Sequence, residues 1–244
     1  MFDQSILLHH LEPLRSLLDA DEVTELVINK PHEIGIEGRG GWQWVDSPKL
    51  STPWLETLSN SMANYTKQKV GPNTPICSTS LPTGERVQIV APPACDLGNY
   101  SITIRKPSIK TFGLDELDAG GLFAQTKIAR GRTSAADAEL SALKQKGDWP
   151  AFLELAVKNR KNILISGATG SGKTTLSKAL IKLIPDEERL LTIEDTRELI
   201  VPHRNAVHLL YSKDGQGQAQ VGAKQLLEAS LRMRPDRILL QELR

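Results

Sequence analysis

Hydrophobic and polar positions follow different periods in the two halves of the chain. In the first half, leucines recur at helical spacing over residues 4–18, and a second amphipathic helix is expected from Pro53 to Gln68, with Thr52 as its N-cap. Short alternating or apolar runs predict six strands, at residues 24–29, 33–37, 42–45, 76–81, 85–90 and 100–106. Residues 1–106 are therefore expected to form an N-terminal α/β domain.

Two of these predicted strands carry an arginine on the face opposite their apolar side chains. Arg105 lies on the polar face of residues 100–105, and Arg86 lies on the polar face of residues 86–90. Taken alone, this pattern is typical of solvated arginines at the surface of a sheet.

The second half alternates helices with apolar strands. Helices are expected to begin near Asp148 and to cover residues 173–184 and 221–233. The expected strands are residues 162–166, 189–194, 206–211 and 237–241. Such alternation predicts a mostly parallel sheet covered by helices, and the runs at 163–165 and 238–240 are apolar on both faces, as buried parallel strands are.

The residues that join the two halves differ from both in amino-acid composition. Residues 107–147 contain five glycines, and an alanine-rich stretch from Thr133 to Lys146 is helical in pattern. We expect a long linker with one or two helices here. The predicted organisation is thus an N-terminal domain at 1–106, a linker at 107–147 and a second domain at 148–244.

Length, charge and cysteine usage narrow the class of protein. The chain has 244 residues, enough for two domains, and 30 Lys and Arg against 29 Asp and Glu give a net charge of +1. Without a basic excess, no sequence-specific binding of nucleic acid is expected. Cys77 and Cys95 match no metal or redox spacing and are expected to be reduced thiols. No secretory leader or bilayer-spanning apolar run is recognised, so a cytoplasmic protein is expected.

Residues 167–174 match the phosphate-binding P-loop, in which two glycines bracket four residues and are followed by Lys and Thr. A predicted strand precedes the loop and a helix follows it, so backbone N–H groups and the helix N-terminus would face a phosphate. Lys173 is expected to reach the β- and γ-phosphates of ATP, and Thr174 is expected to offer its hydroxyl to Mg²⁺. The residues expected to bind the nucleotide are Gly167, Ala168, Thr169, Gly170, Ser171, Gly172, Lys173, Thr174 and Thr175.

Two acidic positions end predicted parallel strands, where open α/β sheets place their sites. Glu194, followed by Asp195, ends one strand, and Glu242 follows another. One carboxylate is expected to hold Mg²⁺ and another to orient or deprotonate the attacking water, while Asp195 has the alternative of capping the next turn. Gln241 stands where an aspartate usually follows the apolar run, which argues against an ABC-type or GTPase P-loop protein.

Five ordered motifs resemble the ring ATPases of type IV secretion systems, within the type II/IV secretion NTPase superfamily. They are residues 81–87 (LPTGERV), 101–107 (SITIRKP), 167–175 (GATGSGKTT), 192–199 (TIEDTREL) and 231–244. The resemblance implies an N-terminal α/β domain joined by a linker to a RecA-like ATPase domain. It further implies assembly as a homo-hexamer, with nucleotide between the domains.

The resemblance also implies roles for individual residues. Glu194 would be the general base in the family's Asp box, and Glu242 would be the Walker B acid and, with Thr174, a ligand of Mg²⁺. Arg86 and Arg105 would close on the phosphates and act in catalysis beside Lys173. The family's His-containing box and C-terminal helices would follow Glu242, so residues 148–244 are expected to be an incomplete ATPase domain. Neither His203 nor His208 fits that box, and His208 is expected to face solvent or a neighbouring chain.

The expected function is an ATP-hydrolysing hexameric motor that powers substrate transfer, pilus assembly or both in a bacterial type IV secretion or conjugation system. Its partners would be inner-membrane components, contacted peripherally from the cytoplasm. One alternative is a nucleotide-binding assembly scaffold without essential hydrolysis. Another is an ATPase of type II secretion or type IV pili, although those typically carry a cysteine-rich metal insertion that two cysteines cannot supply. A DNA-translocating motor has little support in a nearly neutral chain, and the sequence names neither cargo nor docking partners.

Overall fold

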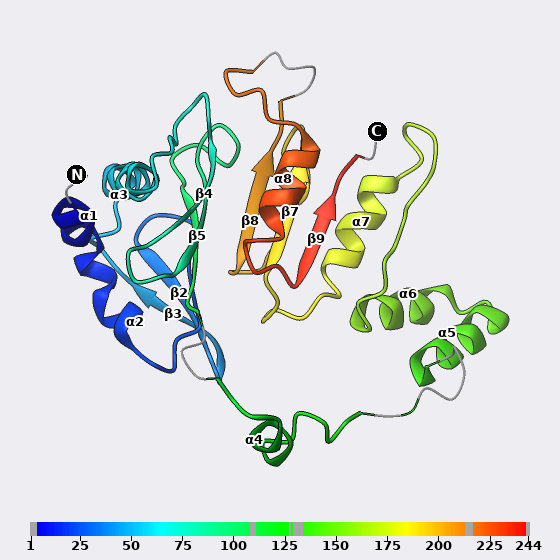
Figure 1. Ribbon diagram of the computed structural model, residues 1–244. Coiled ribbons are helices and arrows are strands. Elements are labelled where there is room, and N and C mark those ends of the chain that lie inside the picture. The colour runs from blue at the N-terminus through cyan, green and yellow to red at the C-terminus, as the bar shows by residue number, and fades with distance from the viewer. Residues whose placement is uncertain (1–3, 108–110, 127, 129–133, 213–216, 243–244) are drawn as a thin grey trace.

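The computed structural model describes residues 4–107, 111–126, 128, 134–212 and 217–242. Two sheets lie side by side (Figure 1). The N-terminal sheet has six strands in the order β3-β2-β1-β6-β5-β4, and the second has three in the order β8-β7-β9. The first sheet is antiparallel throughout and the second is parallel, as the sequence predicted for its second half.

All six predicted N-terminal strands form. They are β1 (Glu25–Ile28), β2 (Glu33–Gly38), β3 (Gly41–Asp46), β4 (Ile76–Ser80), β5 (Arg86–Val90) and β6 (Ser101–Arg105).

The helices of this half are α1 (Gln4–Leu11), the short 3₁₀ helix η1 (Glu12–Leu14), α2 (Arg15–Asp19) and α3 (Thr52–Tyr65). The single helix expected over residues 4–18 is interrupted at η1, because Pro13 has no N–H to donate to the preceding turn. The N-cap of α3 is Ser51 and not Thr52, whose hydroxyl donates instead to the carbonyl of Gly98 at 2.8 Å.

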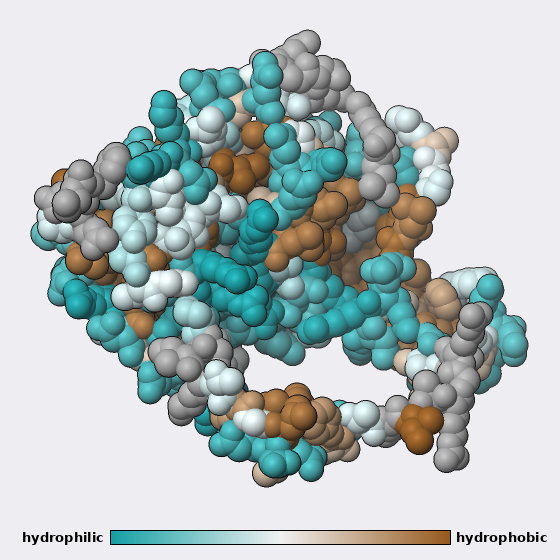
Figure 2. Space-filling view, in the orientation of Figure 1, coloured by the Kyte–Doolittle hydropathy of each residue, from teal (hydrophilic) through white to brown (hydrophobic). Residues whose placement is uncertain are grey.

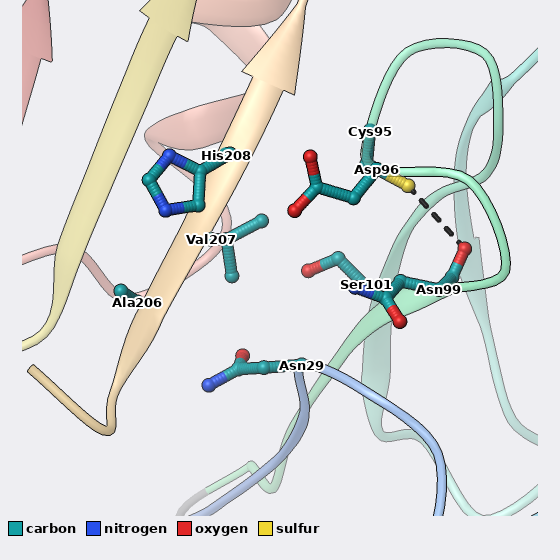
Figure 3. Close-up of a pocket in the computed structure, with 8 residues that line it drawn as sticks. All are labelled: Asn29, Cys95, Asp96, Asn99, Ser101, Ala206, Val207 and His208. Atoms are coloured by element: carbon teal, nitrogen blue, oxygen red, sulfur yellow. Dashed lines mark hydrogen bonds between the residues drawn. The ribbon is translucent and has the colours of Figure 1, made fainter. Parts of the chain in front are cut away.

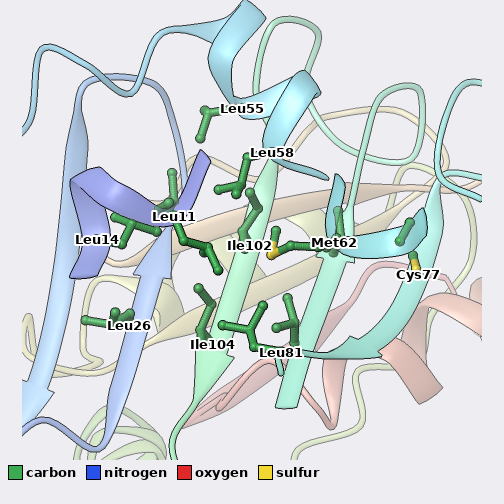
Figure 4. Close-up of a cluster of buried hydrophobic side chains, with 14 of the residues drawn as sticks. Leu11, Leu14, Leu26, Leu55, Leu58, Met62, Cys77, Leu81, Ile102 and Ile104 are labelled. Atoms are coloured by element: carbon green, nitrogen blue, oxygen red, sulfur yellow. The ribbon is translucent and has the colours of Figure 1, made fainter. Parts of the chain in front are cut away.

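One face of the first sheet packs against α1 and α3 and forms the largest apolar core (Figure 4). Leu55, Leu58 and Met62 from α3 meet Ile102 and Ile104 from β6, and all five are buried. Side chains of this size each contribute about 2 kcal/mol when removed from water. This core fixes the orientation of β5 and β6, the strands that carry the two predicted site arginines.

The second half contains β7 (Leu190–Glu194), β8 (Ala206–Leu210), β9 (Arg237–Leu240), α6 (Trp149–Lys158), α7 (Lys173–Ile181) and α8 (Ala223–Ser230). The strand expected at residues 162–166 is not formed: the segment has no strand partner among the described residues, and Leu164 is 78% exposed. The prediction of a buried strand at these residues was therefore wrong.

Between the two halves, the linker runs as an arm away from both sheets (Figure 1). It contains α4 (Leu114–Ala119) and α5 (Ala135–Lys146), and α5 packs on α6. Apolar side chains such as Leu114 and Leu122 stay exposed on this arm (Figure 2). The predicted helical content is present, while the domain boundaries at 106 and 148 stay predictions.

The polar face of the first sheet packs against the second sheet. Cys95 and Leu209 form an isolated antiparallel bridge, and the N–H of Leu210 donates to the carbonyl of Ala94 at 2.9 Å. Ser101 and Thr103, which share this face with Arg105, are both buried by this contact. Arg86 and Arg105 themselves are exposed, as their sequence pattern taken alone predicts.

Arg189, the residue before β7, lies fully buried between the sheets. Its guanidinium donates to the side-chain oxygens of Asn29 at 2.8 Å and Asn205 at 2.5 Å, and to the carbonyl of Met233 at 2.7 Å. Burial lowers the pKa of Arg189 to about 9, although the nearby Glu25 carboxyl opposes this shift. The group therefore remains a cation at neutral pH, held by oxygens from both domains.

The β2–β3 hairpin holds two further arginines of the second half. Arg204 lies 5.0 Å above the Trp44 ring and pairs with Glu33 at 3.3 Å. Arg234 lies 5.6 Å above a second ring, that of Trp42, and also pairs with a carboxylate of β2. A cation over an indole ring contributes about 0.5–2 kcal/mol, so the hairpin forms a double clamp on the second domain.

Glu25 makes this interface sensitive to pH. Burial raises the pKa of Glu25 from 4.5 to about 7, with Arg105 and Arg234 opposing the shift and Glu37 adding to it. Because the folded pKa exceeds the unfolded one, the interface is most stable below about pH 4.5 and loses stability as pH rises through 7.

We predict that Glu25→Gln removes this loss and raises the free energy of unfolding at pH 8.5 by roughly 2–3 kcal/mol relative to the parent. Urea unfolding at pH 5 and pH 8.5 measures it, with the exposed Glu22→Gln as the matched control. Equal pH dependence in both variants and the parent would contradict the assignment.

Candidate nucleotide-binding site

The P-loop at residues 167–172 leads directly into α7. Gly170 and Gly172 have φ values of 78° and 90°, in the left-handed region that favours glycine. A Cβ at Gly167 would lie 2.5 Å from the hydroxyl oxygen of Ser171. The backbone conformation therefore favours glycine at positions 170 and 172, and the Ser171 side chain leaves little room for a larger residue at 167.

Lys173 begins α7, and its ammonium folds back over the loop. It donates to the carbonyls of Gly167 and Ala168, both at 2.8 Å. A full positive charge thus lies beside the N-terminus of a nine-residue helix, where the helix dipole also favours an anion.

The carboxylate beside Thr174 is that of Glu198, which the sequence reasoning did not select. The Thr174 hydroxyl lies 3.5 Å from Glu198 Oε2, and the side-chain amide of Gln241 donates to the same oxygen at 2.6 Å. The start of α7, the segment after β7 and the end of β9 therefore meet at one carboxylate. The sequence feature that could have identified Glu198 is its spacing, four residues beyond Glu194 in the same motif.

Glu194 lies beneath this cluster and is fully buried. Its Oε1 accepts from the Thr192 hydroxyl at 2.7 Å, and its Oε2 accepts from the N–H groups of Glu198 and Leu199 at 2.8 and 2.9 Å. Burial alone would raise its pKa, but hydrogen bonds from His208, both N–H groups and Thr192 outweigh burial and lower the pKa of Glu194 to about 2. Such a carboxylate is a weak proton acceptor at neutral pH; its role as general base stays a prediction that the geometry does not favour.

The other predicted acidic residues lie at the same edge of the sheet. Glu242 follows β9 and is exposed, and its role as Mg²⁺ ligand stays a prediction. Asp195 accepts from the N–H of Thr196 at 2.7 Å, which agrees with the alternative that it caps the following residues.

Arg86 and Arg105 are not brought to the P-loop of their own chain. They are direct neighbours in the register of β5 and β6 and are both exposed. In Figure 1, the strands β8, β7 and β9 lie between α7 and β5, the strand that begins at Arg86. Their predicted action on phosphates stays a prediction.

The expectation that His208 faces solvent or a neighbour was wrong. His208 is buried, with its Nδ1 2.9 Å from the Thr192 hydroxyl oxygen, and it borders a cavity of about 20 Å³ between the two domains (Figure 3). Cys77 and Cys95 are free thiols, as predicted. Both are buried, and burial raises the pKa of Cys95 to about 12.

The oxygen groups of the site fit a magnesium ion carried by nucleotide phosphates. Mg²⁺ prefers oxygen ligands and keeps several waters, so the Thr174 hydroxyl and the Glu242 carboxylate, which follows β9 at the same edge of the sheet, are suitable donors. Over the described ranges, no group of three or more His, Cys, Asp or Glu side chains is placed to hold a metal ion. Over the same ranges, every helix is too short or too polar to cross a bilayer.

Comparison with known proteins identifies the class. Residues 55–244 match the family model described as "Type II/IV secretion system protein". The type IV secretion system protein VirB11 of Bartonella quintana is 49% identical over 251 aligned residues, which cover 98% of this chain and 70% of the relative. VirB11 of Brucella suis is 43% identical, covering 96% of this chain and 66% of that protein.

A solved structure gives the same result. The crystal structure of the VirB11 ATPase from the Brucella suis type IV secretion system, in complex with sulphate, superposes with a TM-score of 0.92 at 42% identity. It covers 98% of this chain and 70% of the solved one. The chain therefore belongs to the type II/IV secretion family, among the VirB11-type ATPases of type IV secretion systems. The relatives favour type IV over type II secretion.

Proposed function

We propose that this chain is the ATP-hydrolysing subunit of a hexameric motor that powers substrate transfer or pilus assembly in a bacterial type IV secretion or conjugation system. The ring would work at the cytoplasmic face of the inner membrane, on inner-membrane components of that system. The observation that carries the proposal is the meeting of Lys173, Thr174 and Glu198 at one edge of a parallel sheet. The Brucella suis relative binds sulphate, an anion with the shape and charge of a phosphate group.

The chemistry follows from the positions of these groups. The P-loop amides and Lys173 would hold the β- and γ-phosphates, with the ammonium exchanging two carbonyl partners for phosphate oxygens. Mg²⁺, held by Thr174 and Glu242, would supply charge neutralisation when bound. Glu198, exposed and oriented by Gln241, would align the attacking water and accept its proton as the bond to the leaving ADP oxygen breaks.

The first test is Lys173→Ala. We expect Mg-ATP hydrolysis to fall by about 100-fold or more, because a charge aimed at the transferring phosphoryl group contributes roughly 3 kcal/mol. Phosphate release is measured beside Lys182→Ala, an exposed lysine at the end of the same helix. Equal rates in the two variants would contradict the site. A parent chain that binds ATP without hydrolysing it would favour the scaffold alternative.

Glu198→Gln tests the assignment of the proton acceptor. Loss of a general base typically lowers the rate by 10²–10⁴-fold, so we expect kcat to fall by about 100-fold while ATP binding is retained. Glu187→Gln, at an exposed position before β7, is the control. A Glu198→Gln variant with the parent's kcat would remove Glu198 from the reaction.

The hexamer gives Arg86 and Arg105 a role that one chain does not offer them. Because β5, which begins at Arg86, and α7 lie on opposite sides of β8, β7 and β9 (Figure 1), we propose that these arginines contact the nucleotide held by a neighbouring copy.

Mixing variants distinguishes this arrangement from contact within one chain. Lys173→Ala and Arg105→Ala are each expected to be nearly inactive alone. An equimolar mixture should regain about a quarter of the parent's rate, since about a quarter of the shared sites receive an intact P-loop and an intact arginine. No recovery on mixing, with Arg105→Ala inactive by itself, would place the arginine on the nucleotide of its own chain.

A further inference from the structure

A buried chain of polar side chains links two strands of the second sheet to the segment that carries Glu198. Thr192 on β7 and His208 on β8 are directly paired in the parallel register. Thr192 and Glu194 lie two residues apart on one strand, so their side chains share a face. All three side chains are buried, which is an expensive place for polar groups unless each is hydrogen-bonded.

The hydrogen bonds that join these three side chains all run in one direction. The Thr192 hydroxyl has a single proton, and it donates that proton to Glu194 Oε1 at 2.7 Å, because an ionised carboxylate can only accept. The hydroxyl oxygen must then accept from His208 Nδ1, which lies 2.9 Å away. The proton of His208 is thereby assigned to Nδ1, and donors aligned in this way strengthen one another.

The other oxygen of Glu194 holds the backbone that follows β7. It accepts from the N–H groups of Glu198 and Leu199, which would otherwise have to find partners elsewhere at this edge of the sheet. With these two bonds made, the Glu198 side chain leaves the opposite side of the segment, toward Thr174 and Gln241. The orientation of Glu198 thus depends on a carboxylate that does not itself face the nucleotide.

We propose that Thr192, Glu194 and His208 are positioning residues for ATP hydrolysis, which fix the segment that presents Glu198 to the P-loop. This inference rests on the proposed function of Glu198. It assigns to Glu194 a role different from proton acceptor, since three donors within 2.9 Å already occupy both of its oxygens.

The network also lies against the N-terminal domain. The cavity beside His208 is bordered on its far side by Cys95 and Asp96, and the Asp96 carboxylate points toward the imidazole (Figure 3). Asp96 is paired with Arg197 at 2.7 Å, one residue before Glu198. The segment that carries Glu198 is therefore held both by Glu194 and, through Arg197, by the N-terminal domain.

Amide hydrogen exchange tests the inference without requiring turnover. In His208→Leu, which lacks the Nδ1 donor, we expect the amides of Glu198 and Leu199 to exchange about ten-fold faster or more than in the parent. His208→Asn places an amide N–H where Nδ1 was and should stay within about two-fold. The exposed His9→Leu is the control. If His208→Leu does not fold, the isosteric Thr192→Val interrupts the same chain and is interpreted in the same way.

Kinetics separates positioning from proton transfer. His208→Leu should lower kcat for ATP by about ten-fold with KM unchanged, and His208→Asn should restore it. Glu194→Gln keeps one oxygen for the two N–H groups and should retain most of the parent's kcat, whereas Glu194→Ala should not.

Parent-like exchange in both His208→Leu and Thr192→Val would overturn the inference, as would a Glu194→Gln variant as inactive as Glu194→Ala. A parent chain without hydrolysis would count against the proposed function alone, and the exchange rates would still decide this inference.

Discussion

The structure depends most on a guanidinium with no exposed surface. Arg189 stands between the two sheets, and removing such a charge from water is costly unless oxygens surround it. Those oxygens come from both halves of the chain: Asn29 from the residue after β1 and Asn205 from the residue before β8. Because Arg189 immediately precedes β7, the strand that ends at Glu194, the contact that joins the domains sets the position of the strand leading to the site.

Two buried glutamates show how strongly partners, and not burial alone, decide charge. Glu25 and Glu194 are both removed from solvent, yet the pKa of Glu25 rises to about 7 and that of Glu194 falls to about 2. Glu194 receives hydrogen bonds from a hydroxyl and two backbone N–H groups, all directed at its carboxylate. Glu25 has arginines nearby as well as a second carboxylate, and burial dominates. Glu194 is therefore a fixed anion, and Glu25 is a group whose charge changes near neutral pH.

Periodicity and motif spacing predicted much of this architecture because both are local properties. The six N-terminal strands, the parallel second sheet and the P-loop each depend on residues close together in sequence. The failures concern contacts between distant segments. Alternation showed that Thr103 and Arg105 share a face, but only the packed sheets show that Thr103 is buried there. Glu198 was missed because its position depends on backbone bonds to Glu194, which no pattern of side chains records.

The double clamp of the β2–β3 hairpin has an optical consequence. Two of the four tryptophans in the chain, Trp42 and Trp44, lie under arginines contributed by the second domain. An indole ring emits according to the polarity and charge around it, so these two rings change environment whenever the sheets part. The intrinsic tryptophan fluorescence of the protein therefore changes when its domains separate, without any added label.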